Sequence, residues 1–258
     1  MYHDFRARLR QGDRLIGTMI TLPSPEATEV LASVGFDWLF LDAEHGVLST
    51  HDLQALLQAA GPAMPGVVRV AAAAEVPIKK ALDIGAAGII VPQVNSAAQA
   101  DQVVRLARYS PLGMRGVGVG RAHGYGLRLQ EYLASANDQV AVIVQVEHID
   151  AVMQIEAIVG VPGIDAVLVG PYDLSASLGR LGDVAHPDVL AAIDRVTRVC
   201  HDAGVRLGIF GVSAAAIEPY LARGYTLLVA GVDTLLLGQA AQALLGQLKA
   251  MNSTPEGG

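Results

Sequence analysis

The sequence predicts an α/β protein folded as a single (β/α)₈ barrel, and three observations support this fold class. Short apolar runs of about five to seven residues, such as GIIVP and DAVLVG, have the length of buried parallel strands. These runs alternate with amphipathic segments eight times in 258 residues, which is the count for such a barrel. No linker rich in Pro or Ser divides the chain, so we expect one domain over residues 1–251 and a disordered tail at 252–258. The alternative is a doubly wound open sheet.

The predicted strands are the apolar runs themselves: 15–21, 38–42, 67–71, 88–94, 140–147, 166–170, 206–211 and 226–231. The predicted helices are the amphipathic segments that follow them: 25–34, 49–60, 76–84, 97–108, 149–158, 187–203, 214–222 and 233–251. Pro25 and Pro187 fall near helix starts, where the missing N–H group does no harm. Gly204 and Gly224 fall just after helices and suit left-handed caps.

The longest irregular stretch is residues 109–126, which contains GVGVG. Its glycine spacing differs from that of a dinucleotide fingerprint, and no strand immediately precedes it. We therefore expect a flexible loop at the rim of the barrel.

Composition excludes several classes of function. Hydrophobic residues make up 52% of the chain, yet no apolar run reaches the roughly 18 residues of a membrane span. The net charge of −7 without a basic patch argues against nucleic-acid binding. The single cysteine, Cys200, excludes an internal disulfide framework and a multi-cysteine zinc site. The charged N-terminal segment has no signal-peptide pattern, so a cytoplasmic location is expected.

Polar and charged side chains recur at the carboxyl ends of several predicted strands. In a barrel these ends meet at one face, which carries the active site. The pattern therefore predicts a site assembled by the fold from residues far apart in the sequence. Its candidate members are Asp42, Glu44, His45, Arg69, Gln145, Glu147 and Asp173.

Glu147 and Asp173 follow the fifth and sixth predicted strands, which are neighbours in a barrel. Two carboxylates in a partly buried site repel, so one must take a proton or a cation must lie between them. Oxygen ligands favour a hard divalent ion such as Mg²⁺ or Mn²⁺. The alternative interpretation is that each carboxylate caps the helix that follows it.

Arg69 interrupts an apolar strand and needs an anionic partner. That partner is either a structural carboxylate or the carboxylate or enolate oxygen of a substrate. His45 has an ordinary pKa near neutrality and suits a general base, although a lone histidine is often structural. Asp83 ends a predicted helix just before the fourth strand, and we expect it to orient the imidazole.

Lysine usage argues against Schiff-base chemistry. The three lysines, Lys79, Lys80 and Lys249, all fall within predicted outer helices, whereas a Schiff base needs a desolvated lysine facing the substrate. Carbonyl chemistry here would depend on a metal ion acting as a Lewis acid.

Four motifs in this order resemble the HpcH/HpaI aldolase family of metal-dependent (class II) pyruvate aldolases. They are DAEH at 42–45, RGVGVGRA at 115–122, QVE at 145–147 and GPYDLS at 170–175, and the similarity extends over nearly the whole chain. The sequence is most similar to the 4-hydroxy-2-oxoheptanedioate and 2-keto-3-deoxy-sugar-acid aldolases of the family.

The resemblance implies a homo-hexamer of barrels in which the last helix is exchanged between subunits. It also implies a divalent metal ion (Mg²⁺, Mn²⁺ or Co²⁺), no organic cofactor, and small-molecule substrates. Reversible cleavage of a 4-hydroxy-2-oxo acid would give an aldehyde and pyruvate or a close 2-oxo acid such as hydroxypyruvate. The alternatives are a related lyase, an oxaloacetate decarboxylase, and a non-catalytic sensor of 2-oxo acids.

The resemblance also assigns roles to residues. By motif, Glu147 and Asp173 would bind the metal ion, and Gln145 and the backbone at Tyr172 would contact the pyruvate moiety. Arg69 would stabilise the enolate, with Asp42 in the same hydrogen-bonded cluster, and His45 would be the base, supported by Asp83.

The sequence departs from the family pattern at several positions. Ala43 replaces glycine in the first motif, and His148 follows Glu147 where Thr or Ser is common. Gln93 and Asn95 replace more typical residues in VPQVN. Tyr172 and Phe210 are bulky, and we expect both to contact the substrate and narrow the pocket.

Overall fold

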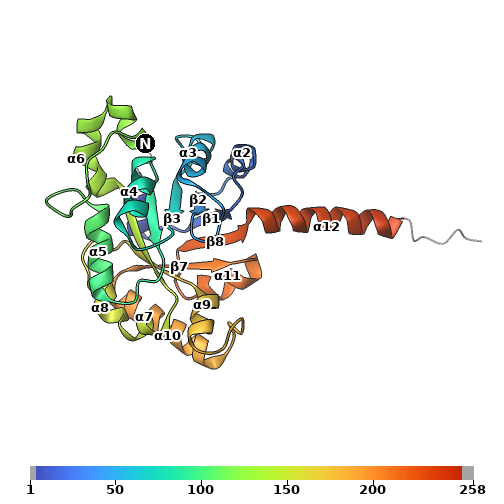
Figure 1. Ribbon diagram of the computed structural model, residues 1–258. Coiled ribbons are helices and arrows are strands. Elements are labelled where there is room, and N and C mark those ends of the chain that lie inside the picture. The colour runs from blue at the N-terminus through green and yellow to red at the C-terminus, as the bar shows by residue number, and fades with distance from the viewer. Residues whose placement is uncertain (1–3, 252–258) are drawn as a thin grey trace, which may run out of the picture.

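A computed structural model describes residues 4–251 and shows a closed barrel of parallel strands (Figure 1). Each strand pairs with the next, and β8 pairs with β1, which closes the ring. The predicted (β/α)₈ barrel is therefore confirmed, and the open doubly wound sheet is wrong. The strands are β1 (Leu15–Ile20), β2 (Trp38–Asp42), β3 (Gly66–Arg69), β4 (Gly88–Val91), β5 (Ala141–Val146), β6 (Ala166–Val169), β7 (Arg206–Gly211) and β8 (Leu227–Val232).

Helices surround the barrel, and the described residues contain more of them than the sequence predicted. Those that correspond to predictions are α2 (Pro25–Ser33), α3 (Thr50–Ala59), α4 (Glu75–Asp83), α5 (Ala97–Ala107), α10 (Pro187–Ala203), α11 (Ala214–Leu221) and α12 (Asp233–Met251). The predicted helix at 149–158 is two short ones, α7 (Ile149–Met153) and α8 (Ile155–Val159). The additional elements are α1 (Phe5–Gln11), the 3₁₀ helix η1 (Arg121–Gly126), α6 (Leu129–Gln139) and α9 (Pro171–Ser177).

Residues 109–126 do not form the flexible rim loop that we expected. The segment contains η1 and packs against the carboxyl end of α4, near the amino ends of the strands. Arg115 anchors it, because its guanidinium lies 4.5 Å from the ring centroid of Tyr109 and 5.5 Å from that of Tyr132. The same side chain donates a 2.7 Å hydrogen bond to Asp83.

The interior of the barrel is filled by alternate side chains of the strands, together with Phe5 and Leu9 from α1. These two α1 residues are almost fully buried and close the amino-terminal end of the barrel. Trp38 is the largest buried side chain of this layer. It requires glycine at position 17, because a Cβ there would lie 2.6 Å from the Trp38 ring.

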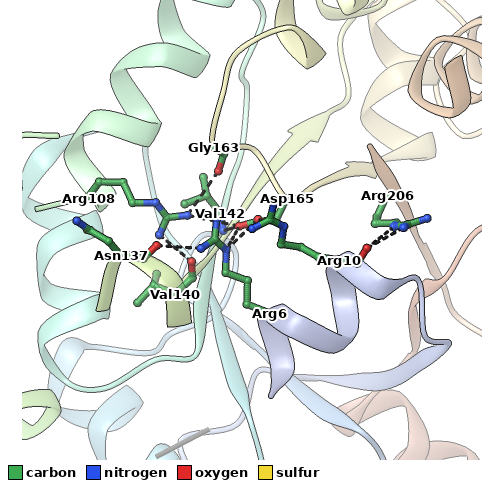
Figure 2. A network of polar contacts seen from close by, with 9 residues as sticks. All are labelled: Arg6, Arg10, Arg108, Asn137, Val140, Val142, Gly163, Asp165 and Arg206. Carbon is green, nitrogen blue, oxygen red and sulfur yellow. Dashed lines mark hydrogen bonds and ion pairs between the residues drawn. The ribbon is translucent and has the colours of Figure 1, made fainter. Parts of the chain in front are cut away.

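A buried polar network lies near Phe5 and Leu9, at the amino-terminal end of the barrel (Figure 2). Arg6 donates to both carboxylate oxygens of Asp165 at 2.8 and 2.9 Å, and Arg108 donates to the same carboxylate at 3.5 Å. The remaining N–H groups of these arginines reach main-chain oxygens such as that of Val140, at 2.7 Å from Arg108. Burial and the neighbouring charge of Arg6 lower the pKa of Arg108 to about 10. The network ties α1 to the floor of the barrel.

The last helix, α12, projects away from the barrel (Figure 1). Several of its apolar side chains are exposed, among them Leu237, Leu244, Leu245 and Leu248. Within residues 4–251, no helix is both long and apolar enough to cross a membrane. The tail predicted to be disordered, residues 252–258, lies outside the described residues.

Candidate active site

The strand alternation that fills the barrel also builds the site. Along β2, Trp38 and Phe40 belong to the interior core, and Asp42 is the next residue of the same parity. Along β3 and β5, Arg69 and Gln145 occupy the same position above the interior apolar residues. Because neighbouring strands point these positions inward, three polar side chains form the top layer of the barrel.

Asp42 and Arg69 are direct partners in the register between β2 and β3. Arg69 donates through Nε and Nη2 to the two oxygens of Asp42, at 2.9 and 2.7 Å. Burial alone would raise the pKa of Asp42, but the hydrogen bonds and charge of Arg69 outweigh it and lower that pKa below its ordinary value. The structural partner considered for Arg69 is thus present. Among the described residues, however, Nη1 of Arg69 makes no hydrogen bond, and the side chain lines a cavity.

Glu44 and His45 lie beside this pair, beyond the end of β2. Oε2 of Glu44 is 3.3 Å from Nε of Arg69 and 3.7 Å from Nε2 of His45. That oxygen is buried and accepts no hydrogen bond within the described chain. Burial is the main cause that raises the pKa of Glu44, and the charge of Glu147 adds to it. His45 is 68% exposed and lines the cavity at its mouth.

Glu147 is a buried carboxylate that is held from two sides. Its Oε1 accepts a 2.8 Å hydrogen bond from the main-chain N–H of Gln93, and its Oε2 accepts a short hydrogen bond from Nε2 of Gln145. Gln93 adopts a positive φ of 55°, a conformation that few non-glycine residues take outside functional sites. Burial raises the pKa of Glu147, and the nearby charge of Asp173 raises it further.

Gly170 allows a close approach between β6 and the Glu147 side chain. A Cβ at position 170 would lie 3.0 Å from Cβ and 3.1 Å from Oε2 of Glu147. Pro171 then starts α9, which carries Tyr172 and Asp173 to the edge of the cavity.

Helix capping does not explain either carboxylate. No side chain caps α9, whose N-cap position is Gly170. At α7 the cap is His148, whose Nδ1 accepts a 3.1 Å hydrogen bond from the N–H of Asp150. The histidine that departs from the family pattern is therefore a helix cap, and the capping interpretation of Glu147 and Asp173 is wrong.

The donor set fits a hard divalent ion that keeps several positions for other ligands. Glu147 and Asp173 supply carboxylate oxygens, and Oε1 of Gln145 is buried without a hydrogen-bond partner in the described chain. Residues 4–251 contain no cluster of three or more His, Cys, Asp or Glu side chains arranged for metal binding. Two carboxylates with water or substrate completing the shell is the arrangement typical of Mg²⁺.

The cavity above these residues has a volume of about 300 Å³. Its polar side comes from β2, β3, β5 and α9. Its opposite wall is apolar and carries Met19, Leu168 and Phe210, with Thr21 beside them. A small ligand therefore meets charged groups on one side and mainly hydrocarbon on the other.

Comparison with known proteins agrees with this geometry. The model of the HpcH/HpaI aldolase/citrate lyase family matches residues 16–240. The chain belongs to this family. A hydroxypyruvate/pyruvate aldolase of Pseudomonas aeruginosa is 41% identical over 249 residues, which cover 95% of this chain and 92% of that protein. A 2-keto-3-deoxy-L-rhamnonate aldolase of Klebsiella pneumoniae is 40% identical, covering 98% of this chain and 95% of that protein.

A solved structure shows the same architecture. The crystal structure of an HpcH/HpaI aldolase/citrate lyase family protein from Burkholderia cenocepacia superposes with a TM-score of 0.92 and is 40% identical, covering 96% of this chain and 99% of that one. The resemblance noted from the motifs is therefore confirmed, as is the expectation that the chain is an aldolase-type lyase.

Asp83, which we expected in the site, lies at the other end of the barrel. Asp83 ends α4 and therefore lies near the amino ends of the strands, whereas His45 follows the carboxyl end of β2. Its carboxylate pairs with Arg115. Within one chain Asp83 therefore does not lie beside His45, because a helix that follows a barrel strand runs back to the opposite face.

Several residues of the site were not predicted. Met19, Thr21, Phe40 and Leu168 line the cavity, and strand alternation applied to β1, β2 and β6 would have identified them. Asp233 was also missed. It accepts hydrogen bonds from the main-chain N–H groups of Thr21 and Leu22 at 2.9 and 2.8 Å, and it fixes the loop after β1.

Proposed function

We propose that this protein is a divalent-metal-dependent aldolase. It reversibly cleaves 4-hydroxy-2-oxo acids to an aldehyde and pyruvate, or a close 2-oxo acid such as hydroxypyruvate. The observation that supports this most directly is the carboxylate of Asp173 at the cavity, with the buried carboxylate of Glu147 and the unpartnered Oε1 of Gln145 beside it. The names of the relatives that are about 40% identical over nearly the whole chain agree with it.

Glu147 and Asp173 would hold the ion, whether Mg²⁺, Mn²⁺ or Co²⁺, which when bound supplies a Lewis-acid charge for the keto acid. Arg69 would donate its free Nη1–H group to the oxygen that becomes negative when the enolate forms. Asp42 keeps the guanidinium in place through two hydrogen bonds, so this donor is preorganised. Gln145 and the backbone at Tyr172 would orient the carboxylate and keto group of the 2-oxo acid.

His45 would be the base that removes a proton from the carbon next to the keto group. Its position at the mouth gives the imidazole access to water, which can relay the proton. In the direction of cleavage the same group takes the proton of the 4-hydroxyl, and the electrons of the C3–C4 bond pass to the enolate as the aldehyde forms. The enolate then takes that proton back at C3, through water, to give the 2-oxo acid, and the aldehyde leaves through the open side.

Proton exchange tests this proposal without knowledge of the aldehyde. Pyruvate incubated with the protein in D₂O should lose its methyl proton signal in the NMR spectrum when Mg²⁺ or Mn²⁺ is present, and should keep it after chelation of the metal. Exchange that persists in excess chelator would contradict the metal-dependent mechanism. Binding of pyruvate without any exchange would instead support the 2-oxo-acid sensor.

Loss of CO₂ from oxaloacetate would give the same enolate, but the names of the relatives do not favour a dedicated decarboxylase. Measured together, the two activities separate the proposals. An aldolase should release pyruvate from a 4-hydroxy-2-oxo acid, whereas a dedicated decarboxylase should act on oxaloacetate alone.

We also propose that the chain assembles as a hexamer in which α12 packs on a second copy. Several leucines of α12 are exposed in one chain, including Leu237, Leu244 and Leu248, and burying them would stabilise an oligomer. Light scattering after size-exclusion chromatography should give a mass about six times 26.9 kDa. A double change of Leu244 and Leu248 to glutamate should lower that mass, and an unchanged mass would contradict a role for α12.

A further inference from the structure

We infer that the aldehyde handled by this site is uncharged, so that aldehydes carrying a second carboxylate or a phosphate are poor substrates. The inference rests on the proposed function and specifies the chemical class of its second substrate. It comes from three features of the cavity: its cations, its total charge and the hydrogen-bonding state of its far wall.

The cavity offers no free cation for a second anionic group. Among the described residues that line it, Arg69 is the only arginine or lysine. Two of its N–H groups are taken by Asp42, and Glu44 lies 3.3 Å from its Nε. The remaining Nη1 would serve the 2-oxo acid, which leaves nothing positive for the aldehyde end.

The formal charge around the cavity is strongly negative. Asp42 and Asp173 line the cavity, and Glu44 and Glu147 lie directly behind Arg69 and Gln145, so four carboxyl groups stand against one guanidinium. A bound divalent ion would be offset by the carboxylate of the keto acid and by the carboxylates that remain. A second anion entering this partly buried space would meet repulsion that water screens only weakly.

The wall opposite the charged groups can accept hydrogen bonds but offers few donors. Oγ1 of Thr21 lies 2.7 Å from a carboxylate oxygen of Asp233 and must donate its proton there. The main-chain N–H of Thr21 is bound to the same carboxylate. Thr21 therefore presents only lone pairs to a ligand, which suits the hydroxyl of a hydroxyaldehyde and disfavours a carboxylate or phosphate oxygen.

The rest of that wall is hydrocarbon. Met19, Leu168 and Phe210 line it, and the exposed Tyr172 stands at its edge. Met19, Leu168 and Phe210 can pack against a short carbon chain, but they provide no compensation for a charge removed from water.

A pair of aldehydes that differ in charge tests the inference on the intact protein. We expect kcat/KM for condensation with pyruvate to be at least about tenfold lower for succinic semialdehyde than for its methyl ester, methyl 4-oxobutanoate. The ester is the larger molecule, so a preference for it is not steric. An equal or higher kcat/KM for the semialdehyde would overturn the inference.

Pyruvate exchange in D₂O, measured in the same samples, separates the two levels of the argument. Absent exchange contradicts the proposed function. Normal exchange together with efficient use of the anionic aldehyde contradicts only the inference about the aldehyde.

Adding a cation to the far wall provides a second test. Phe210→Lys should raise the ratio of kcat/KM for the semialdehyde over the ester at least about tenfold relative to Phe210→Met, which has similar length and no charge. Equal ratios in the two variants would show that charge does not govern this wall, and would contradict the inference.

Discussion

The two ends of the barrel each hold a buried arginine–aspartate cluster, and they differ in what is left unpaired. At the floor, Asp165 accepts from Arg6 and Arg108, whose other hydrogen bonds reach main-chain oxygens, and α1 covers the cluster. At the mouth, Arg69 binds Asp42 but keeps one free N–H edge beside a cavity of about 300 Å³. The same chemical pair is therefore structural where its hydrogen bonds are complete, and available for a ligand where they are not.

Of the changes at either end of the barrel, we expect substitution of the proposed metal ligand Glu147 to reduce pyruvate exchange most. Glu147→Gln removes a charge from the ion site, and we expect pyruvate exchange to fall on the order of 1000-fold while the fold is kept. Mn²⁺ binding measured by electron paramagnetic resonance should weaken in parallel. Glu156→Gln, in an exposed ion pair with Arg195, is the matched control and should change neither quantity. Unaltered Mn²⁺ affinity in Glu147→Gln would contradict the assignment of the site.

Removal of the base should affect exchange but not metal binding. For His45→Ala we expect exchange to fall on the order of 100-fold, as is typical for loss of a general base, with Mn²⁺ affinity unchanged. His201→Ala, which changes an exposed histidine at the end of α10, is the control. Equal exchange rates in His45→Ala and the parent protein would remove His45 from the role of base.

We expect a change at Arg69 to lower activity less than a change at His45, but more than a change at an exposed ion pair. Arg69→Lys keeps the charge and loses the planar fork, so we expect kcat to fall on the order of tenfold or more. Arg195→Lys, in an exposed pair, is the control and should keep full activity. A kcat unchanged in Arg69→Lys would show that the fork is structural at this end too.

A change in the cluster at the amino-terminal end of the barrel should lower the free energy of unfolding and leave pyruvate exchange almost unchanged. Asp165→Asn leaves two buried guanidinium groups without their carboxylate, and we expect the free energy of unfolding to drop by about 3–5 kcal/mol in urea denaturation. Exchange per folded molecule should stay within about twofold of the parent, since the cluster touches no part of the cavity. Asp188→Asn, in an exposed pair with Arg180, should cost less than about 1 kcal/mol. A large loss of pyruvate exchange in Asp165→Asn at normal stability would contradict a purely structural role for this cluster.

Much of the fold was predictable because barrel strands are short, buried and regularly spaced. Each of the predicted strands is present, and strand ends led to Asp42, Arg69 and Gln145 as members of one layer, with Glu147 just beyond the end of β5. The missed helices have weaker signals. The segment of α1 reads FRARLRQ, a largely charged stretch in which burial of Phe5 and Leu9 depends on the barrel already being closed.

The contacts of Asp83 and Arg115 were not predictable for a different reason. Motifs show which residues a family keeps, but not at which end of the barrel a helix terminus lies or which side chain it meets. Likewise, the hydrogen bond from the backbone of Gln93 to Glu147 depends on one residue with a positive φ, which glutamine does not signal.

The carboxylate of Asp233 has a consequence for how the protein is made. It joins Thr21 to a residue 212 positions later, so the loop after β1 is fixed only after all eight strands have been translated. The residues proposed to hold the ion all precede residue 180, whereas Phe210 of the cavity lining and the Asp233 carboxylate that fixes Thr21 come later in the chain. Closure of the barrel and fixation of the loop after β1 therefore both depend on the last strand and the residue that follows it.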